Sequence, residues 1–217
     1  MADLVTVVIS ALNDERSVAD AVDSAFAAGA AEVIVSDGGS SDQTREIARA
    51  HRATVIQSLP WRSRQFNAGA RIAKHDAILF LHADTTLPAG ACDAAAGALE
   101  RFDFGGFRIA FKERGWRLRI VAMLINLRTQ ITRCPWGDQA QFIRRGAGEF
   151  KEIAFMEDYE LPTGMKRRAT LLPLRVTTSG RRFLEKGLVR TAITNWTIVL
   201  RWRRGADPDD LRRMYRS

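Results

Sequence analysis

The sequence is poor in cysteine and has no long hydrophobic run. Its 217 residues include only Cys92 and Cys134, with neither a CxxC pair nor a neighbouring histidine cluster. This pattern argues against a disulfide framework or a zinc site and favours reduced thiols in a cytosolic protein. The longest uninterrupted apolar stretch, 120–125, is far shorter than the roughly 20 residues that a membrane-spanning helix needs. Because Met1 is followed almost directly by a β-branched segment, we also expect no signal peptide.

Two common phosphate-binding motifs are also missing. The chain has no GxGxxG and no GxxxxGK[ST] pattern, so neither a Rossmann dinucleotide site nor a P-loop is supported. No Pro/Gly/Ser-rich linker divides the chain, and its 46% hydrophobic and 27% charged residues are ordinary for a globular protein. We predict one domain over residues 1–182, comprising a nucleotide-binding half (1–102) and an acceptor half (103–182), with a C-terminal amphipathic helical extension over 183–217.

Charge is distributed unevenly along the chain. Residues 1–100 hold 8 Lys+Arg and 13 Asp+Glu, a net charge of −5, whereas residues 101–217 hold 25 and 12, a net charge of +13. A solvated basic face would account for most of the arginines, and a surface that meets anions is the functional alternative. Those anions could be ligand phosphates, a membrane surface or nucleic acid. The lack of interleaved aromatic platforms and of a reading motif argues against nucleic acid.

Strand and helix patterns alternate through the first hundred residues, which predicts βαβ units, a mostly parallel sheet and an α/β fold. We expect strands at 4–10, 33–36, 53–57 and 77–81. Between and after them we expect helices at 13–28, 40–50, 63–73 and 88–101. Beyond residue 103 the pattern changes to strands at 104–111, 140–144 and 170–178 and helices at 116–131, 157–167, 183–203 and from 208 onward.

Two carboxylates follow buried strands of this predicted sheet. Asp84 lies just past the apolar run 77–81, and Asp37 directly follows the strand 33–36. Open α/β sheets build their ligand crevices beyond the carboxyl ends of such strands. Hard divalent cations such as Mg²⁺ take one or two carboxylates plus substrate phosphates, so Asp84 suits a metal that bridges a diphosphate. His82, two residues earlier, could ligate a softer ion such as Mn²⁺ or only form a hydrogen bond.

Other polar clusters have two interpretations each. Asp37 and Gly38 fit a tight turn or a close approach to a ligand, and Asn13 and Glu15 fit helix capping or a ligand contact. Arg64, Asn67 and Arg71 share one helical face, which is either solvated or directed at phosphate through Arg64. Glu157 and Asp158 either compensate the charge of Lys166, Arg167 and Arg168 or supply a general base. An i, i+4 apolar stripe on the helix 183–203 is expected to pack on the core or, in the sharper interpretation, to lie on an anionic membrane; it comprises Leu184, Leu188, Ala192, Trp196 and Val199 or Leu200.

Taken in order, these residues resemble the family 2 glycosyltransferases of the GT-A fold over most of the chain. Residues 13–15 are similar to the family's Tyr-Asn-Glu contact, with Leu12 and an inserted Asp14 as departures, and 37–44 resemble its Asp-Gly-Ser-x-Asp-x-Thr signature. Residues 64–70 resemble its Arg-x-x-x-x-Asn-x-Gly-x segment. His82-Ala83-Asp84 occupies the DxD position, with histidine replacing the first aspartate. Four short motifs are similar to a bacterial subgroup labelled arsenosugar-biosynthesis glycosyltransferases; they lie at 81–85, 134–139, 157–161 and 178–182.

The resemblance implies inverting transfer of a sugar from a nucleotide-diphosphate sugar to the hydroxyl of a small-molecule or lipid-linked acceptor, a reaction of the hexosyltransferase class. Asp158 would be the general base and Asp84, with His82, would hold Mg²⁺ or Mn²⁺. The donor would contact residues from four segments, namely Asn13, Glu15, Asp37, Gly38, Arg64, Asn67, Arg181 and Arg182. We expect a cytoplasmic protein that could touch the inner face of the membrane. A sugar nucleotidyltransferase-like enzyme, a basic nucleic-acid- or membrane-binding module and an inactive scaffold remain alternatives.

Overall fold

The computed structural model describes residues 4–165 and 169–216, which form a single seven-stranded sheet in the order β3-β2-β1-β4-β6-β5-β7. Strand β6 runs antiparallel to β4 and β5, and the other pairs are parallel, as the sequence predicts. The strands are β1 (Val5–Ala11), β2 (Glu32–Asp37), β3 (Thr54–Gln57), β4 (Ala77–His82), β5 (Phe104–Phe111), β6 (Phe142–Arg144) and β7 (Ala169–Thr178).

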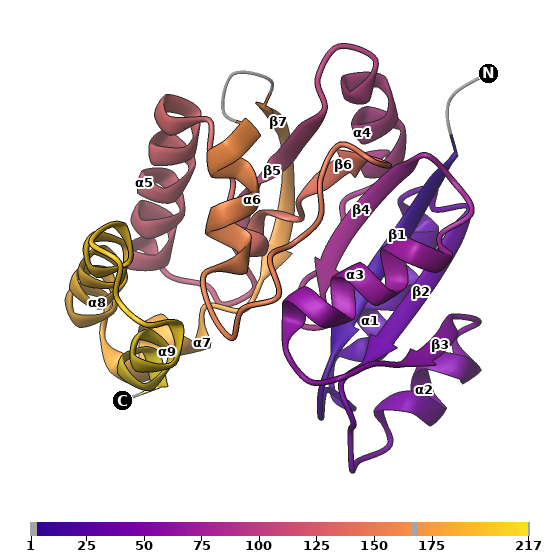
Figure 1. The fold of residues 1–217 in the computed structure, drawn as a ribbon, viewed down its shortest axis with the longest axis horizontal. Coiled ribbons are helices and arrows are strands. Elements are labelled where there is room, and N and C mark those ends of the chain that lie inside the picture. The colour runs from indigo at the N-terminus through magenta and orange to yellow at the C-terminus, as the bar shows by residue number, and fades with distance from the viewer. Residues whose placement is uncertain (1–3, 166–168, 217) are drawn as a thin grey trace.

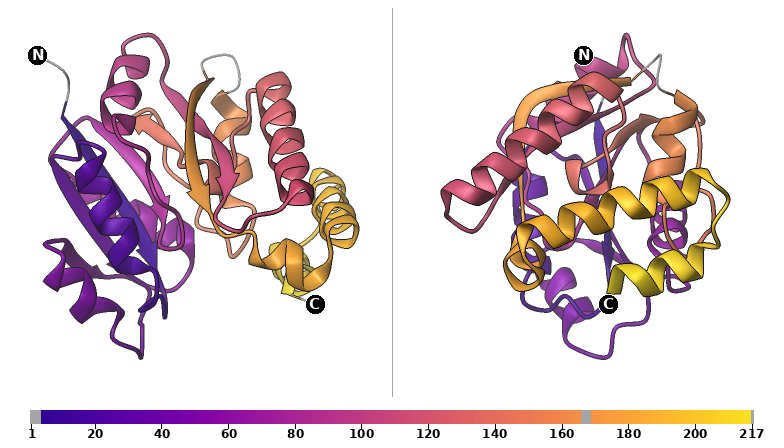
Figure 2. Two further views of the ribbon diagram at one scale, coloured as in Figure 1. Left: turned by 180° about the vertical axis from the view of Figure 1, so that it is seen from behind. Right: turned by 90° about the vertical axis from the view of Figure 1, so that its left-hand side faces the viewer.

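Helices cover both faces of the sheet, as Figures 1 and 2 show. One core cluster joins α1, α4 and α5 to one face, and a second joins α3 and α6 to the other. Strands β1 and β4 are buried on both faces, which explains why their sequences are almost continuously apolar. The helices are α1 (Val18–Ala27), α2 (Thr44–Ala50), α3 (Arg62–Ile72), α4 (Ala91–Leu99), α5 (Trp116–Thr132), α6 (Glu157–Met165), α7 (Arg181–Lys186), α8 (Leu188–Arg203) and α9 (Pro208–Arg216), with a 3-10 turn η1 (Gly137–Gln139).

Three helix starts differ from the sequence prediction. Helix α1 begins at Val18 rather than at residue 13, because the Asp14 carbonyl first closes a turn by accepting the amides of Ser17 and Val18. Helix α2 begins at Thr44 rather than at residue 40, since the predicted capping segment forms a loop. Helix α4 begins three residues after Pro88, behind a left-handed glycine.

The C-terminal helices also depart from expectation. The predicted helix 183–203 is broken at Gly187, whose φ of +83° favours glycine, and this separates α7 from α8. The apolar stripe predicted to pack on the core does so only in part. Val199 is buried, whereas Leu184, Trp196 and Leu200 are exposed, because α8 turns inward the side that carries Ile198 and Val199. No helix in residues 4–165 and 169–216 is long and apolar enough to traverse a bilayer.

Candidate active site at the carboxyl edge of the sheet

The parallel strands bring their carboxyl ends to one edge of the sheet. Ala11 pairs with Asp37 across β1 and β2, and Ser10 pairs with His82 across β1 and β4. The polar segments that follow these strands therefore start side by side, as parallel pairing predicts.

Asp37 shapes the turn that follows β2. Its carboxylate is fully buried and accepts the amides of Gly39 and Ser40, each at 3.0 Å from Oδ2. Gly38 allows a close approach of Gln65, because a Cβ at Gly38 would lie 3.0 Å from Gln65 Nε2. Gln65 Nε2 in turn donates to the carbonyls of Ala11 and Ser36 and so ties together the ends of β1 and β2.

Asn13 and Glu15 lock the loop after β1 against the loop after β2. Asn13 Oδ1 accepts the Ser41 amide at 2.9 Å, and Glu15 Oε2 accepts the Gln43 amide at 3.2 Å. Neither side chain caps α1 as the alternative interpretation expected. The two side chains instead fix the shape of the exposed rim around Asp37.

Arg62 is a central residue that the sequence interpretation missed. Its Nε lies 2.9 Å from Oε1 of Glu157, whose side chain is only 3% exposed. Burial lowers the pKa of Arg62, but the carboxylates of Glu157 and then Asp158 outweigh it and raise the pKa, so the guanidinium stays charged. The spacing Arg-x-x-x-x-Asn-x-Gly runs from residue 62 through Asn67 to Gly69, so the motif itself contained the signal.

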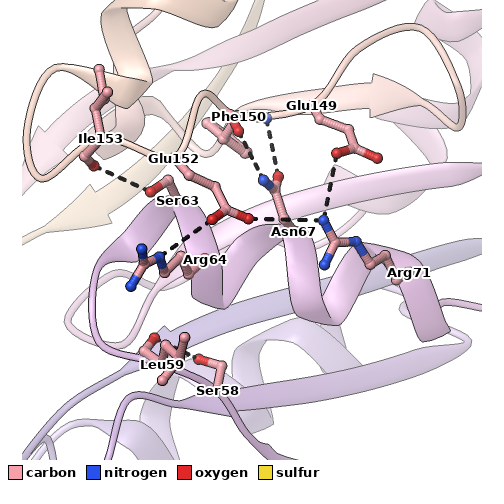
Figure 3. A network of polar contacts seen from close by, with 10 residues as sticks. All are labelled: Ser58, Leu59, Ser63, Arg64, Asn67, Arg71, Glu149, Phe150, Glu152 and Ile153. Atoms are coloured by element: carbon pink, nitrogen blue, oxygen red, sulfur yellow. Dashed lines mark hydrogen bonds and ion pairs between the residues drawn. The ribbon is translucent and has the colours of Figure 1, made fainter.

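Figure 3 shows that Arg64 and Asn67 are engaged elsewhere. Arg64 lies over the Trp61 ring and pairs with Glu152, with 3.3 Å between its Nε and Oε2. Asn67 is buried, donates to the carbonyl of Phe150 at 2.8 Å and accepts its amide at 3.0 Å. The structure thus gives Asn67 the task of holding the segment around Phe150 to α3, and it turns Arg64 toward the same segment rather than toward Glu157. Neither placement supports the predicted contact with a nucleotide.

His82, Gly137 and Asp158 form a tight group. The Gly137 amide donates to Asp158 Oδ2 at 3.1 Å. A Cβ on Gly137 would lie 2.7 Å from His82 Nε2 and 3.0 Å from Asp158 Oδ2, so no larger residue fits here without a shift. Burial, followed by the Arg62 charge, lowers the pKa of His82 to about 4, although Asp84 and Asp158 oppose this. The imidazole is therefore neutral at physiological pH and has a lone pair to offer.

Buried glutamines frame this group. Gln141 Nε2 donates to the carbonyls of Pro135 and Asp158, both at 2.8 Å, and so links η1 to the first turn of α6. Gln139 accepts from Thr129 and donates to the carbonyl of Phe107, which fixes η1 against β5. The short segment 134–141 is therefore a rigid support for Asp158.

Asp84 is an exposed carboxylate just past the end of β4. Burial raises the pKa of the nearby Asp14, and the negative charge of Asp84 adds to the increase. No cluster of three or more His, Cys, Asp or Glu side chains suited to a metal occurs in the part of the chain that the structure describes. A single exposed carboxylate beside a neutral imidazole nevertheless fits Mg²⁺ or Mn²⁺, because such ions can take the remaining ligands from a diphosphate and water.

Asp138 was not singled out in the sequence. Burial raises its pKa to about 6, although the Arg128 guanidinium acts in the opposite direction. Its Oδ1 is buried without a hydrogen-bond partner among the described residues. An unpaired carboxyl of this kind, next in sequence to Gly137, belongs to the polar lining of the site.

Arg181 and Arg182 occupy different surroundings. Arg181 is 80% exposed, and its Nε lies 3.6 Å from Oε1 of Glu185. Burial raises the pKa of Asp14, and the Arg181 charge opposes that increase, which places Arg181 near Asp14 on the rim. Arg182 instead stacks on Tyr215 of α9 and donates to that residue's carbonyl at 3.0 Å. Lys166, Arg167 and Arg168, the proposed charge partners of Glu157 and Asp158, lie outside the described residues, and Arg62 is the pair partner that the structure shows for Glu157.

An open pocket of 780 Å³ borders the same helix that carries Asp158. It lies between α6 and the turn that joins α8 to α9. Across it, Trp202 donates to Glu160 at 2.6 Å and Arg203 donates to the Tyr159 hydroxyl at 2.8 Å. These bonds fix the end of α8 against α6.

Comparison with solved structures establishes the GT-A fold. Glucosyl-3-phosphoglycerate synthase from Mycobacterium tuberculosis, solved with Mn²⁺, UDP and glucosyl-3-phosphoglycerate, is 19% identical with a TM-score of 0.59; the match covers 88% of this chain and 78% of that one. S. aureus TarS is 18% identical with a TM-score of 0.63, and 81% of this chain matches only 36% of the TarS chain. This chain therefore spans about a third of the length of that structure.

Sequence comparison gives the family. No curated protein matches the chain. The family model described as glycosyl transferase family 2 matches residues 6–155, which include β2 to β6 and all but the first residue of β1. The match contains Arg62, His82 and Asp84 and ends just before Glu157 and Asp158. The chain therefore belongs to glycosyl transferase family 2.

Proposed function

We propose that this protein moves a sugar, with inversion, from a nucleotide-diphosphate sugar to an acceptor hydroxyl, as a hexosyltransferase. The observation that carries the proposal is the convergence of Arg62, His82, Asp84 and Asp158 at the carboxyl edge of a family 2 domain. The Arg62 cation and a metal held by the exposed carboxylate of Asp84 would stabilise the charge of a diphosphate leaving group. Asp158 is the candidate base for the acceptor.

Each residue has a defined task in this proposal. Asp158 accepts the proton of the acceptor hydroxyl as its oxygen attacks the anomeric carbon, and the Gly137 amide orients the carboxylate. Arg62, held by Glu157, neutralises the charge that develops on the departing diphosphate. Asp84, with His82, would hold the divalent cation, which when bound would stabilise that same charge.

Asp37, Gly38 and the interlocked rim of Asn13 and Glu15 form the proposed nucleoside-binding side. Arg181 is a proposed rim contact for the donor phosphates. We further propose that residues 1–182 form the catalytic domain and that 183–217 are an extension. The four short motifs favour the arsenosugar-biosynthesis subgroup of bacterial glycosyltransferases. We place the protein in the cytoplasm, with a small-molecule or lipid-linked acceptor.

The test combines two substitutions with a donor screen. UDP-, GDP- and dTDP-sugars are screened with Mn²⁺ by thermal shift, since a ligand that binds the folded state raises its melting temperature. With the donor that binds, Asp158→Asn should lose ~10²–10⁴-fold in kcat and keep its donor affinity. Asp84→Ala should lose the metal-dependent part of donor binding, whereas the exposed control Asp20→Asn should keep both.

Normal turnover by Asp158→Asn would remove Asp158 from the role of base. Equal nucleotide-diphosphate affinity of Asp84→Ala and wild type, with and without metal, would remove Asp84 from the role of metal ligand. If no nucleotide sugar shifts the melting temperature, the proposed function itself is wrong.

A further inference from the structure

Two helices expose long apolar stripes to solvent. On α5, six large apolar side chains are between 43% and 74% exposed, and on α8 four more are between 45% and 73% exposed. Within each helix they recur at spacings of three and four, so they form one continuous face. They are Trp116, Ile120, Met123, Leu124, Leu127 and Ile131 on α5 and Val189, Ile193, Trp196 and Leu200 on α8.

Neither stripe is the side of the helix that packs on the protein. Helix α5 buries Leu118 and Ala122 against the core, about half a turn away from its exposed stripe. Helix α8 buries Ile198 and Val199 against the cluster that includes Tyr159 of α6. Each helix is therefore apolar on two opposite sides, and packing within the chain explains only one of them. An exposed apolar area of this extent marks an interaction surface.

The charged residues of both helices are all basic. Residues 114–137, which include α5, contain five Lys+Arg and no Asp or Glu, and residues 186–206, which include α8, likewise contain five and none. The cations are Arg114, Arg117, Arg119, Arg128 and Arg133 in the first segment and Lys186, Arg190, Arg201, Arg203 and Arg204 in the second.

The two helices lie on the same flank of the molecule, at the side away from β3. Both are at the left in Figure 1, and both face the viewer in the right-hand view of Figure 2. The two helices that carry the apolar stripes thus lie on one side of the protein.

We propose that α5 and α8 together form a docking face for the surface of an anionic phospholipid bilayer. An amphipathic helix with arginines at its edges and tryptophan in its apolar face binds flat in the interface of such a membrane. Trp116 and Trp196 supply one interfacial aromatic side chain on each helix. The described helices are not suited to spanning the bilayer, so the contact is peripheral.

Charge decides against a second copy of this chain as the occupant. A symmetric dimer through this face would bring two surfaces without carboxylates on α5 and α8 together, and like charges across an interface repel. Anionic lipid offers the complementary charge over an area of any size. Neither the apolar stripes nor the arginines of these helices take part in the proposed transfer reaction.

Docking would also bring the candidate active site close to the bilayer. Helix α8 contacts α6 through its buried side, and α6 carries Asp158. The site would then lie one helix layer behind the membrane face.

Vesicle co-sedimentation of the full chain tests the proposal without any substrate. Vesicles of phosphatidylcholine alone are compared with vesicles that contain about 30 mol% phosphatidylglycerol, at about 0.1 M and 0.5 M NaCl. We expect binding that is at least about tenfold tighter to the anionic vesicles and that weakens at the higher salt concentration. The tryptophan fluorescence should shift to shorter wavelength on binding, as Trp116 and Trp196 leave water.

Three variants separate the features. Leu127→Glu/Ile193→Glu places carboxylates in both stripes and should reduce binding at least about tenfold. Arg119→Gln/Arg201→Gln leaves the stripes intact and should reduce the preference for anionic lipid. Ile72→Glu changes an exposed apolar residue on α3, away from this face, and should bind as wild type does. Melting temperatures verify that each variant is folded.

Three results would overturn the proposal. The first is an absence of binding to anionic vesicles, and the second is unchanged binding by Leu127→Glu/Ile193→Glu. The third is a lipid-free dimer, measured by light scattering, that Leu127→Glu/Ile193→Glu dissociates. That result would show that a second copy covers the face.

Discussion

Arg62 and Glu157 form an ion pair, 2.9 Å from Nε to Oε1, that joins the start of α3 to the start of α6. The pair links two segments separated by almost a hundred residues and sets the guanidinium next to Asp158. One acidic residue thus positions a cation, and the following residue is the proposed base.

The pair predicts unequal effects of two neighbouring arginines. Arg62→Gln leaves the Glu157 carboxylate buried without its partner and should cost about 3 kcal/mol of unfolding free energy. It should also weaken donor binding. Arg64→Gln removes only a partly exposed pair with Glu152 and should cost less than about 1 kcal/mol.

Urea unfolding and donor titration of both variants measure the contrast. The double variant Arg62→Gln/Glu157→Gln provides the control, because it removes the unpaired charge and should recover part of the stability but none of the donor binding. Equal donor affinity of Arg62→Gln and Arg64→Gln would show that Arg62 has only a structural role.

Gly137 predicts a steric effect on catalysis. A methyl group at this position would lie 2.7 Å from His82 Nε2 and 3.0 Å from Asp158 Oδ2, so Gly137→Ala must displace one or both side chains. We expect a loss of about 1–3 kcal/mol in stability from overpacking, and a drop in kcat of more than about tenfold because the base is displaced. Gly97→Ala, in α4 with open space around it, is the matched control and should be neutral or stabilising. Full turnover by Gly137→Ala would show that catalysis does not depend on the present positions of His82 and Asp158.

Much of the fold could be predicted from the sequence because the strands carry strong local signals. The apolar runs 33–36 and 77–81 lie in β2 and β4. The helix predicted over 183–203 is also present, except that Gly187 divides it into two helices. The helix starts were less predictable, because polar residues such as Ser40 and Asn13 bond across loops that are distant in sequence. Local patterns cannot show which of two such partners is chosen.

The candidate site was predictable where position on a strand decides the matter, and unpredictable where packing does. Asp84 follows from the end of β4, whereas the choice between Arg62 and Arg64 depends on which side of α3 faces α6. Asn67 shows the same limit, since a buried amide that bonds to a backbone resembles a ligand contact in the sequence. The apolar stripe predicted on 183–203 was expected to pack on the core or to lie on a membrane, because periodicity alone does not say which apolar side is covered.

Asn67 predicts a change in stability rather than in ligand affinity. Asn67→Ala removes both hydrogen bonds to Phe150 and leaves a buried amide and carbonyl unpaired, which should cost about 3 kcal/mol. Arg71→Ala, on the same helix, loses only exposed ion pairs at 3.7 and 3.9 Å and should change stability by less than about 1 kcal/mol. Thermal and urea unfolding give both values. A wild-type melting temperature for Asn67→Ala, together with weaker donor binding, would restore Asn67 to the nucleotide site.

Asp138 predicts a pH dependence of stability. Burial raises its pKa in the folded protein to about 6 from an ordinary value of 3.8. The folded state therefore holds the proton more tightly, and the resulting stabilisation is complete below the lower pKa and lost as the pH rises through the higher one. A shift of this size corresponds to about 3 kcal/mol.

The substitution Asp138→Asn removes the titrating group and keeps its shape. We therefore expect the unfolding free energy of the variant, relative to wild type, to rise by roughly 2–3 kcal/mol between pH ~4 and pH ~7. Urea unfolding of both proteins across this range measures the difference, and other titrating groups cancel in the subtraction. A difference that does not vary with pH would show that Asp138 keeps its ordinary pKa. A difference that falls as the pH rises would show that the charge of Arg128 outweighs burial.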